Sequence, residues 1–128
     1  MLNGIKILVA ENNLVNQKIV NYILNKQGAI VKNVVNGMEA IALLPDGDFD
    51  VVLMDLQMPG MDGFEAARHI RGELGSNIPI IALTADMFAN ETSECRDAGI
   101  NVCISKPFDP TALCEMILSL TRLGTMTK

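Results

Sequence analysis

Basic residues, cysteines and long apolar runs are all scarce in this sequence. Ten Lys and Arg side chains stand against fifteen Asp and Glu, for a net charge of -5. Because affinity for nucleic acid depends on basic side chains that displace phosphate counterions, we expect no direct binding to DNA or RNA. No apolar run approaches the ~18 residues of a membrane-spanning helix. The N-terminus lacks the pattern of a signal peptide, so we expect a soluble domain that makes no membrane contact.

The three cysteines, Cys95, Cys103 and Cys114, carry no disulfide or metal-site pattern. Their number is odd, and no CxxC or Cys/His ligand spacing is present. We therefore expect neither a disulfide framework nor a zinc site, and we interpret each thiol as a buried apolar residue without a redox function. Free cysteines are typical of a reducing, cytoplasmic setting.

The chain has 128 residues, of which 49% are hydrophobic, enough for one domain with a sizeable core. Short apolar segments alternate with stretches of helical periodicity. The predicted strands are residues 5–10, 30–35, 50–55, 78–84 and 102–105, each followed by a helix. This alternation predicts an α/β fold in which helices cover both faces of a parallel sheet.

Local signals predict where several helices begin and end. Asn36 with Glu39, and Asp62 with Glu65, have the spacing of capping boxes at helix N-termini. Pro45 is expected to stop the helix that begins after Asn36, because proline lacks the N–H of a helical hydrogen bond. We expect a core at about residues 5–122 of a single domain over 1–128, followed by a tail or linker stub at 123–128.

Polar side chains stand where the predicted strands end. Glu11 and Asn12 follow the first strand, Asp55 ends the third, Thr84 ends the fourth, and Lys106 follows the fifth. Ligand sites of open α/β sheets lie at this edge. Each residue alone is also a common turn former or cap, but together they match the needs of phosphoryl transfer to a carboxylate.

In that chemistry each residue type has a role. Asp55 is the candidate nucleophile, which would hold an acyl phosphate. A magnesium ion, which prefers oxygen ligands, would neutralise charge in the transition state. Lys106 and Thr84 would contact phosphoryl oxygens as a point charge and a hydroxyl donor.

The segments ILVAENN, VVLMDLQMPGMDGFEA, IIALTA and ISKPF together resemble the receiver domain of two-component response regulators, from Ile5 to Leu120. LVNQKIVNYIL, NGMEA and MDLQMPGMDG are most similar to receivers of hybrid sensor histidine kinases. The resemblance implies a flavodoxin-like (βα)5 three-layer sandwich with strand order 2-1-3-4-5. It also implies phosphorelay with a histidine kinase or histidine phosphotransfer domain. Two settings stay open, a stand-alone cytoplasmic receiver and the cytoplasmic part of a membrane-bound sensor kinase. The output and the oligomeric state, a homodimer included, stay open.

By resemblance, Asp55 is the phosphoacceptor, Thr84 the switch hydroxyl and Lys106 the phosphate-pairing lysine. The implied Mg²⁺ ligands are Glu11, Asn12, Asp55 and the backbone carbonyl of Gln57. A cis bond is implied between Lys106 and Pro107. The implied partner surface comprises the helix at 87–98, the strand through Cys103 and the last helix, and the switch region includes Cys103, Pro107 and Phe108.

Two positions depart from the family pattern. Asn12 stands where the family has its second acid, which removes a charge from the metal site and is expected to weaken Mg²⁺ affinity. Cys103 stands where many receivers have Tyr or Phe, so the aromatic part of the switch is absent or altered.

Two other functions fit parts of the same pattern. One is a pseudo-receiver, a binding module without phosphorylation, which Asn12 favours. The other is a haloacid-dehalogenase-like phosphatase, which would need an acid/base carboxylate where this chain has Gln57, an amide that cannot transfer that proton. For a receiver we expect self-catalysed phosphotransfer to Asp55 and no independent substrate turnover.

Overall fold

Strands and helices alternate along the chain, as the sequence predicts. The computed structural model describes residues 2–84, 89–106 and 108–126, with side chains left out at 89–92 and 122–126. The strands are β1 Lys6–Ala10, β2 Ile30–Val34, β3 Val51–Asp55, β4 Ile80–Thr84 and β5 Val102–Ser105. The helices are α1 Leu14–Lys26, α2 Gly37–Gly47, α3 Gly63–Gly72, α4 Ala89–Ala98 and α5 Pro110–Met126.

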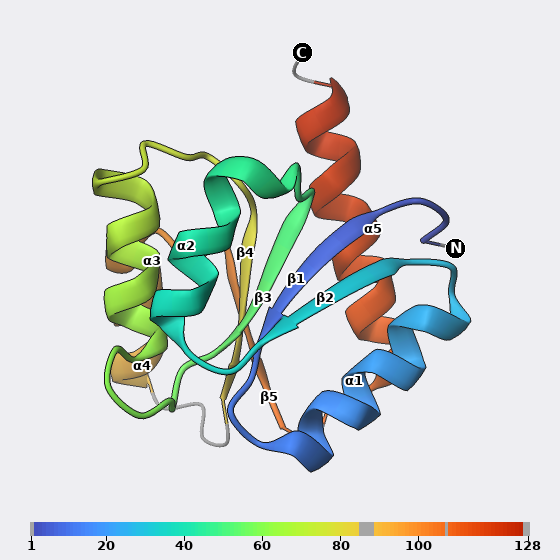
Figure 1. Ribbon diagram of the computed structural model, residues 1–128, viewed down its shortest axis with the longest axis horizontal. Coiled ribbons are helices and arrows are strands. Elements are labelled where there is room, and N and C mark those ends of the chain that lie inside the picture. Colours follow the sequence, from blue (N-terminus) through green and yellow to red (C-terminus); the bar gives the residue numbers. More distant parts are fainter. Residues whose placement is uncertain (1, 85–88, 107, 127–128) are drawn as a thin grey trace.

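The strands form one parallel sheet in the order β2-β1-β3-β4-β5, which confirms the α/β class and the strand order. Helices α1 and α5 cover one face, and α2, α3 and α4 cover the other (Figure 1). The carboxyl ends of all strands therefore meet at one edge. The chain reverses its winding at β1, which places the loops after β1 and β3 side by side there.

Each face of the sheet has its own apolar core, because successive side chains of a strand point to opposite faces. One core contains Leu8, Met54 and Ile80 and lies under α2, α3 and α4. The other contains Leu53 and Ile81 and lies under α1 and α5. The three inner strands β1, β3 and β4 are consequently buried almost throughout.

The predicted helix starts at Asn36 and Asp62 are confirmed. The Asn36 Oδ1 accepts a hydrogen bond from the Glu39 amide at 2.8 Å, and the Asp62 Oδ1 accepts one from the Glu65 amide at 2.9 Å. The prediction that Pro45 stops α2 is wrong, since the helix continues to Gly47. Proline lacks its own N–H and its ring crowds the carbonyl four residues earlier, but the N–H groups of the two residues after it can still complete the last turn.

Helix α5 continues to Met126, through positions that the sequence assigned to a tail.

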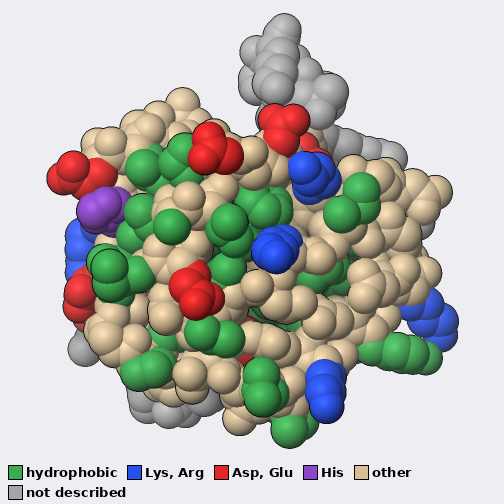
Figure 2. All heavy atoms as spheres, viewed as in Figure 1, with side chains coloured by type: hydrophobic (Ala, Val, Ile, Leu, Met, Phe, Trp, Pro, Cys, Tyr) green, Lys and Arg blue, Asp and Glu red, His purple; other side chains and the backbone are tan. Residues whose placement is uncertain are grey.

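Within the described ranges, every helix is too short or too polar to cross a bilayer. On the face with β2 in front, acidic side chains lie mostly toward α2 and α3 and basic side chains mostly toward β2 and α1, with apolar side chains between them (Figure 2).

The expectation of free thiols is wrong for two of the three cysteines. Cys95 on α4 and Cys103 on β5 form a disulfide, with Cα atoms 6.9 Å apart, and Cys114 is free and buried. Sequence spacing gave no sign of it because α4 runs back along β5, which brings residues on a helix and on a strand together. The argument from free cysteines to a reducing compartment therefore loses its support.

Candidate functional site

Three ionisable side chains meet at the carboxyl edge of the sheet. The Lys106 Nζ lies 3.0 Å from Glu11 Oε1 and 3.4 Å from Asp55 Oδ2. Both carboxylates are buried, with Glu11 1% and Asp55 7% exposed. The sequence-predicted Glu11, Asp55 and Lys106 are thus brought together from β1, β3 and the end of β5, and one ammonium group contacts two acids.

The loop after β3 holds Asp55 through its backbone. The Gln57 amide donates to Asp55 Oδ1 at 3.0 Å. This loop packs against the start of α3 at Gly63, where a Cβ atom would lie 2.8 Å from the Asp55 carbonyl oxygen and 2.8 Å from the Leu56 Cα. A side chain at Gly63 would therefore displace the backbone that positions the carboxylate.

Glu11 is held equally firmly at the end of β1. Its Oε2 accepts a hydrogen bond from the Asn13 amide at 3.1 Å, and its carbonyl accepts one from the Gln17 side chain at 2.6 Å. The side chain of Asn13 caps α1 by accepting from the Asn16 amide. The residues that end the strand therefore also begin the helix.

The two carboxyl groups titrate unequally. Burial, and then the hydrogen bond and charge of Glu11, raise the pKa of Asp55 to about 6, although the Gln57 amide and the Lys106 charge act in the opposite direction. Burial also opposes ionisation of Glu11, but hydrogen bonds from Asp55, Lys106 and Asn13, with the Lys106 charge, lower its pKa overall. Above about pH 6 both carboxyl groups are therefore ionised, and the site then holds more negative charge than Lys106 alone offsets.

Thr84 lies at the same edge, fully buried at the end of β4. Its carbonyl accepts a hydrogen bond from the Lys106 amide at 2.7 Å, directly beyond the β4–β5 ladder that pairs Thr84 with Ser105. The backbone at Thr84 and the backbone at Lys106 are therefore linked, so a shift in one is transmitted to the other.

The predicted metal ligands are only partly convergent. Glu11 and Asp55 supply two buried carboxylates, whereas Asn12 is exposed, and Gln57 has an exposed side chain. In the described part of the chain, no cluster of three His, Cys, Asp or Glu side chains could hold a metal ion. The two carboxylates nevertheless fit Mg²⁺, because they are hard oxygen donors whose mutual repulsion a cation would relieve. Asn12 is a neutral amide, so the site offers Mg²⁺ one negative charge fewer than a carboxylate at position 12 would.

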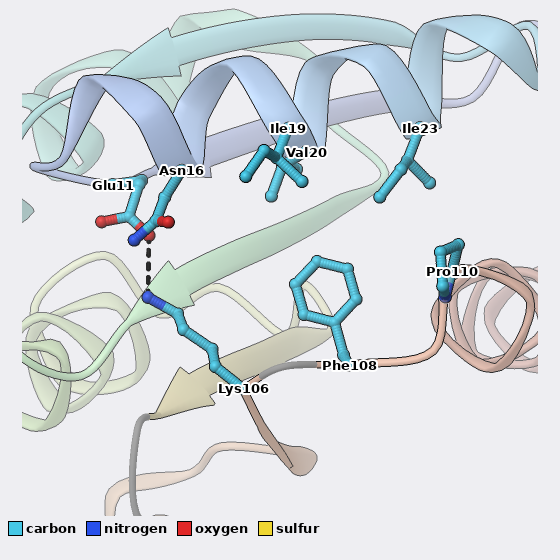
Figure 3. Close-up of a pocket in the computed structure, with 8 residues that line it drawn as sticks. All are labelled: Glu11, Asn16, Ile19, Val20, Ile23, Lys106, Phe108 and Pro110. Atoms are coloured by element: carbon cyan, nitrogen blue, oxygen red, sulfur yellow. Dashed lines mark hydrogen bonds and ion pairs between the residues drawn. The ribbon is translucent and has the colours of Figure 1, made fainter.

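A pocket of about 350 Å³ opens beside the site (Figure 3). The apolar side chains of α1 form one wall, and the Phe108 ring points toward them from the opposite wall. The pocket is lined by Glu11, Asn16, Ile19, Val20, Ile23, Lys106, Phe108 and Pro110.

Phe108 was predicted as a switch residue, and here it lies in this pocket. Cys103 lies instead in the disulfide with Cys95. Pro107 and its peptide bond fall outside the described residues, as does the predicted helix start at Met87.

Sequence reasoning missed the contribution of α1. Ile19 is 51% exposed and Val15 65% exposed, whereas Val20 and Leu24 face the core. The helical repeat identified all of these as apolar, but it did not indicate that the helix is apolar on an exposed side as well. The excess of apolar residues around α1 was the available signal.

The chain is similar to known proteins over most of its length. The family described as response regulator receiver domain matches residues 7–118. The chain belongs to this family. Its receiver relatives include histidine kinase 2 of Arabidopsis thaliana, which is 38% identical over 135 residues, or 88% of this chain and 12% of that protein.

Two solved receiver structures bear on the site. The receiver domain of a sensor histidine kinase from Pseudomonas aeruginosa, with a magnesium ion coordinated in its active-site cleft, is 35% identical, has a TM-score of 0.85, and covers 92% of this chain and 98% of its own. A co-crystal structure from Saccharomyces cerevisiae joins a histidine phosphotransfer protein to the receiver of its downstream response regulator. It matches at 29% identity and a TM-score of 0.88, over 97% of this chain and 93% of the matched chain.

This receiver is thus a domain of two-component signalling, related to hybrid histidine kinases. It spans about 12% of histidine kinase 2 and 15% of a rice relative, probable histidine kinase 6.

Proposed function

We propose that Asp55 is the phosphoacceptor of this receiver and takes a phosphoryl group from a phosphohistidine donor. In this step an Asp55 carboxylate oxygen forms a bond to phosphorus while the phosphorus–nitrogen bond to the histidine breaks, and the released imidazole takes a proton. The observation that carries the proposal is the contact of Lys106 with both Glu11 and Asp55 at the buried edge.

Positioning and electrostatics supply the catalysis. The Gln57 amide orients Asp55, and Lys106 places a positive charge beside the carboxylate. Thr84, at the neighbouring strand end, is the proposed hydroxyl donor to a phosphoryl oxygen. When bound, Mg²⁺ supplies charge that offsets the phosphoryl oxygens, and Glu11 and Asp55 would hold it with the Gln57 carbonyl and Asn12. The magnesium-bound relative supports this assignment.

We propose further that the donor domain docks on α1 and the pocket beside it. Ile19 is exposed and lines the pocket together with Glu11 and Lys106, and the exposed apolar side chains of Leu14 and Val15 precede it on α1. A histidine-bearing domain seated there would bring its imidazole to Asp55 without crossing the sheet. The yeast complex of a phosphotransfer protein with a receiver supports this class of partner.

The proposal is tested by the intact mass of the chain after incubation with Mg²⁺ and a small phosphodonor. One added phosphoryl group, dependent on Mg²⁺, is expected for the unmodified chain and none for Asp55→Asn. Asp50→Asn is the matched control, because Asp50 is an exposed carboxylate just before the other end of β3. Labelling of Asp55→Asn would refute Asp55 as the acceptor. Labelling only in Asn12→Asp would instead identify a pseudo-receiver that Asn12 silences.

A further inference from the structure

The strongest unexplained feature outside the proposed phosphorylation site is the disulfide between α4 and β5. Cys95 is 3% exposed and belongs to the core under α2, α3 and α4, and Cys103 packs against the same core. Cys114 lies in the other core, across the sheet. The sheet therefore separates Cys114 from the pair, so that, of the three cysteines, Cys95 and Cys103 can form a disulfide only with each other.

We propose that Cys95 and Cys103 form a redox modification site that reacts with small thiols and disulfides of the glutathione class. The two ends of the bond differ in access. Cys103 is partly exposed on β5, which is an edge strand of the sheet, whereas Cys95 is buried. An incoming thiolate therefore attacks the Cys103 sulfur.

The chemistry balances as two exchange steps. The incoming thiolate forms a bond to Cys103 Sγ, the Sγ–Sγ bond breaks, and Cys95 leaves as a thiolate that takes a proton. A second small thiolate attacks the small-molecule sulfur of the mixed disulfide and releases Cys103. Two small thiols are oxidised to one small disulfide, and the protein gains two thiols. The reverse sequence, driven by the small disulfide, restores the bond.

The bond lies close to the proposed site, and its consequence for signalling rests on the proposed function. Cys103 pairs in register with Ala82 on β4, two residues before Thr84, and lies three residues before Lys106. The disulfide ties α4 to this strand pair. The oxidised form holds α4 on β5, and the reduced form leaves α4 free to move when Thr84 and Lys106 respond to a phosphoryl group at Asp55.

The first test is a redox titration that does not involve phosphorylation. The folded chain is equilibrated in buffers of varied reduced and oxidised glutathione, quenched in acid, unfolded and alkylated, and its mass is measured. We expect one alkyl group at the oxidising end, on Cys114, and three at the reducing end. Cys114→Ala should keep the transition, whereas Cys103→Ser and Cys95→Ala should abolish it. Three alkyl groups at every ratio, or one at every ratio, would overturn the proposal.

The second test measures amide hydrogen exchange of α4 in the two forms, with and without phosphorylation. We expect exchange in α4 at least tenfold slower in the disulfide form, and a response to phosphorylation in the reduced form alone. Equal α4 exchange in both forms would overturn the tether. If neither form accepts a phosphoryl group, the proposed function fails, while the redox titration and the exchange difference without phosphorylation still decide the redox site.

Discussion

At the scale of single residues, Asp55 and Glu11 place two carboxyl groups in one buried site beside a single ammonium group. The pKa of Asp55 is raised from 3.8 to about 6. The folded protein therefore binds this proton more tightly than the unfolded chain does. The resulting stabilisation is fully present below pH 3.8 and is lost as the pH rises through about 6.

Asp55→Asn should consequently stabilise the fold at neutral pH, because it removes the buried charge while keeping the shape. We expect a gain in unfolding free energy of about 1–3 kcal/mol at neutral pH that shrinks toward pH 4. Urea unfolding followed by circular dichroism at several pH values measures it, with Asp50→Asn as the control. A gain that does not change with pH would contradict the raised pKa of Asp55.

Asn12→Asp should strengthen Mg²⁺ binding, since it adds a carboxylate beside Glu11 and Asp55. We expect roughly tenfold tighter binding by isothermal titration calorimetry, at the low end of the 1–3 kcal/mol that contacts to charged groups contribute. Asn13→Asp is the matched control, because it adds the same charge one residue away at the α1 cap. If both variants bind equally, net charge explains the gain and Asn12 is no ligand position.

At the scale of elements, Arg71 joins the end of α3 to the loops that flank β4 and β5. Its guanidinium donates to the carbonyls of Gly99, Ser76 and Ile78 and to Asn101 Oδ1, at 2.6–3.0 Å. Burial lowers the pKa of this group, and its hydrogen bonds compensate for the lost hydration.

Arg71→Ala should therefore lower the free energy of unfolding by about 2–3 kcal/mol, because it leaves several carbonyls without their charged donor. Arg68→Ala, an exposed arginine on the same helix, should change it by less than about 0.5 kcal/mol. Chemical denaturation of the two variants compares them directly. Equal losses would show that the helix, and not the hydrogen-bond network, is sensitive to substitution.

The exposed apolar side of α1 makes a separate prediction about partners. Ile19→Glu should slow phosphotransfer from a phosphorylated histidine phosphotransfer domain by about tenfold or more, since it places a charge in the proposed docking surface. Transfer from a small phosphodonor should be unchanged, because the Asp55 carboxylate is held by the Gln57 amide and by Lys106 rather than by Ile19. Ile30→Glu is the control, with a similarly exposed isoleucine on β2 at 55% exposure. Equal slowing with the small donor would indicate damage to the site itself.

At the scale of the whole molecule, Mg²⁺ binding should be linked to global stability. The two carboxylates that would hold the ion come from β1 and β3 and meet only in the folded state, so the ion binds the folded chain preferentially. At ten times the dissociation constant this linkage contributes about 1.4 kcal/mol. Addition of Mg²⁺ should raise the melting temperature and chelation should restore it, with a smaller shift in Asp55→Asn. An equal shift in that variant would place the ion elsewhere.

The sequence alone determined the alternation of strands and helices, the parallel sheet, the capped helix starts at Asn36 and Asp62, and which side chains end the strands. These features are local, because hydrophobic periodicity and side-chain-to-backbone hydrogen bonds act over a few residues. The shared edge of Glu11, Asp55 and Lys106 also followed, since parallel strands end together.

Only the tertiary structure decided the rest. It paired Cys95 with Cys103 across α4 and β5, carried α2 past Pro45, and turned Ile19 outward while Val20 packed inward. Each of these outcomes depends on how one element packs against another. Spacing along the chain does not specify this packing, because many arrangements of the same elements keep the same periodicity.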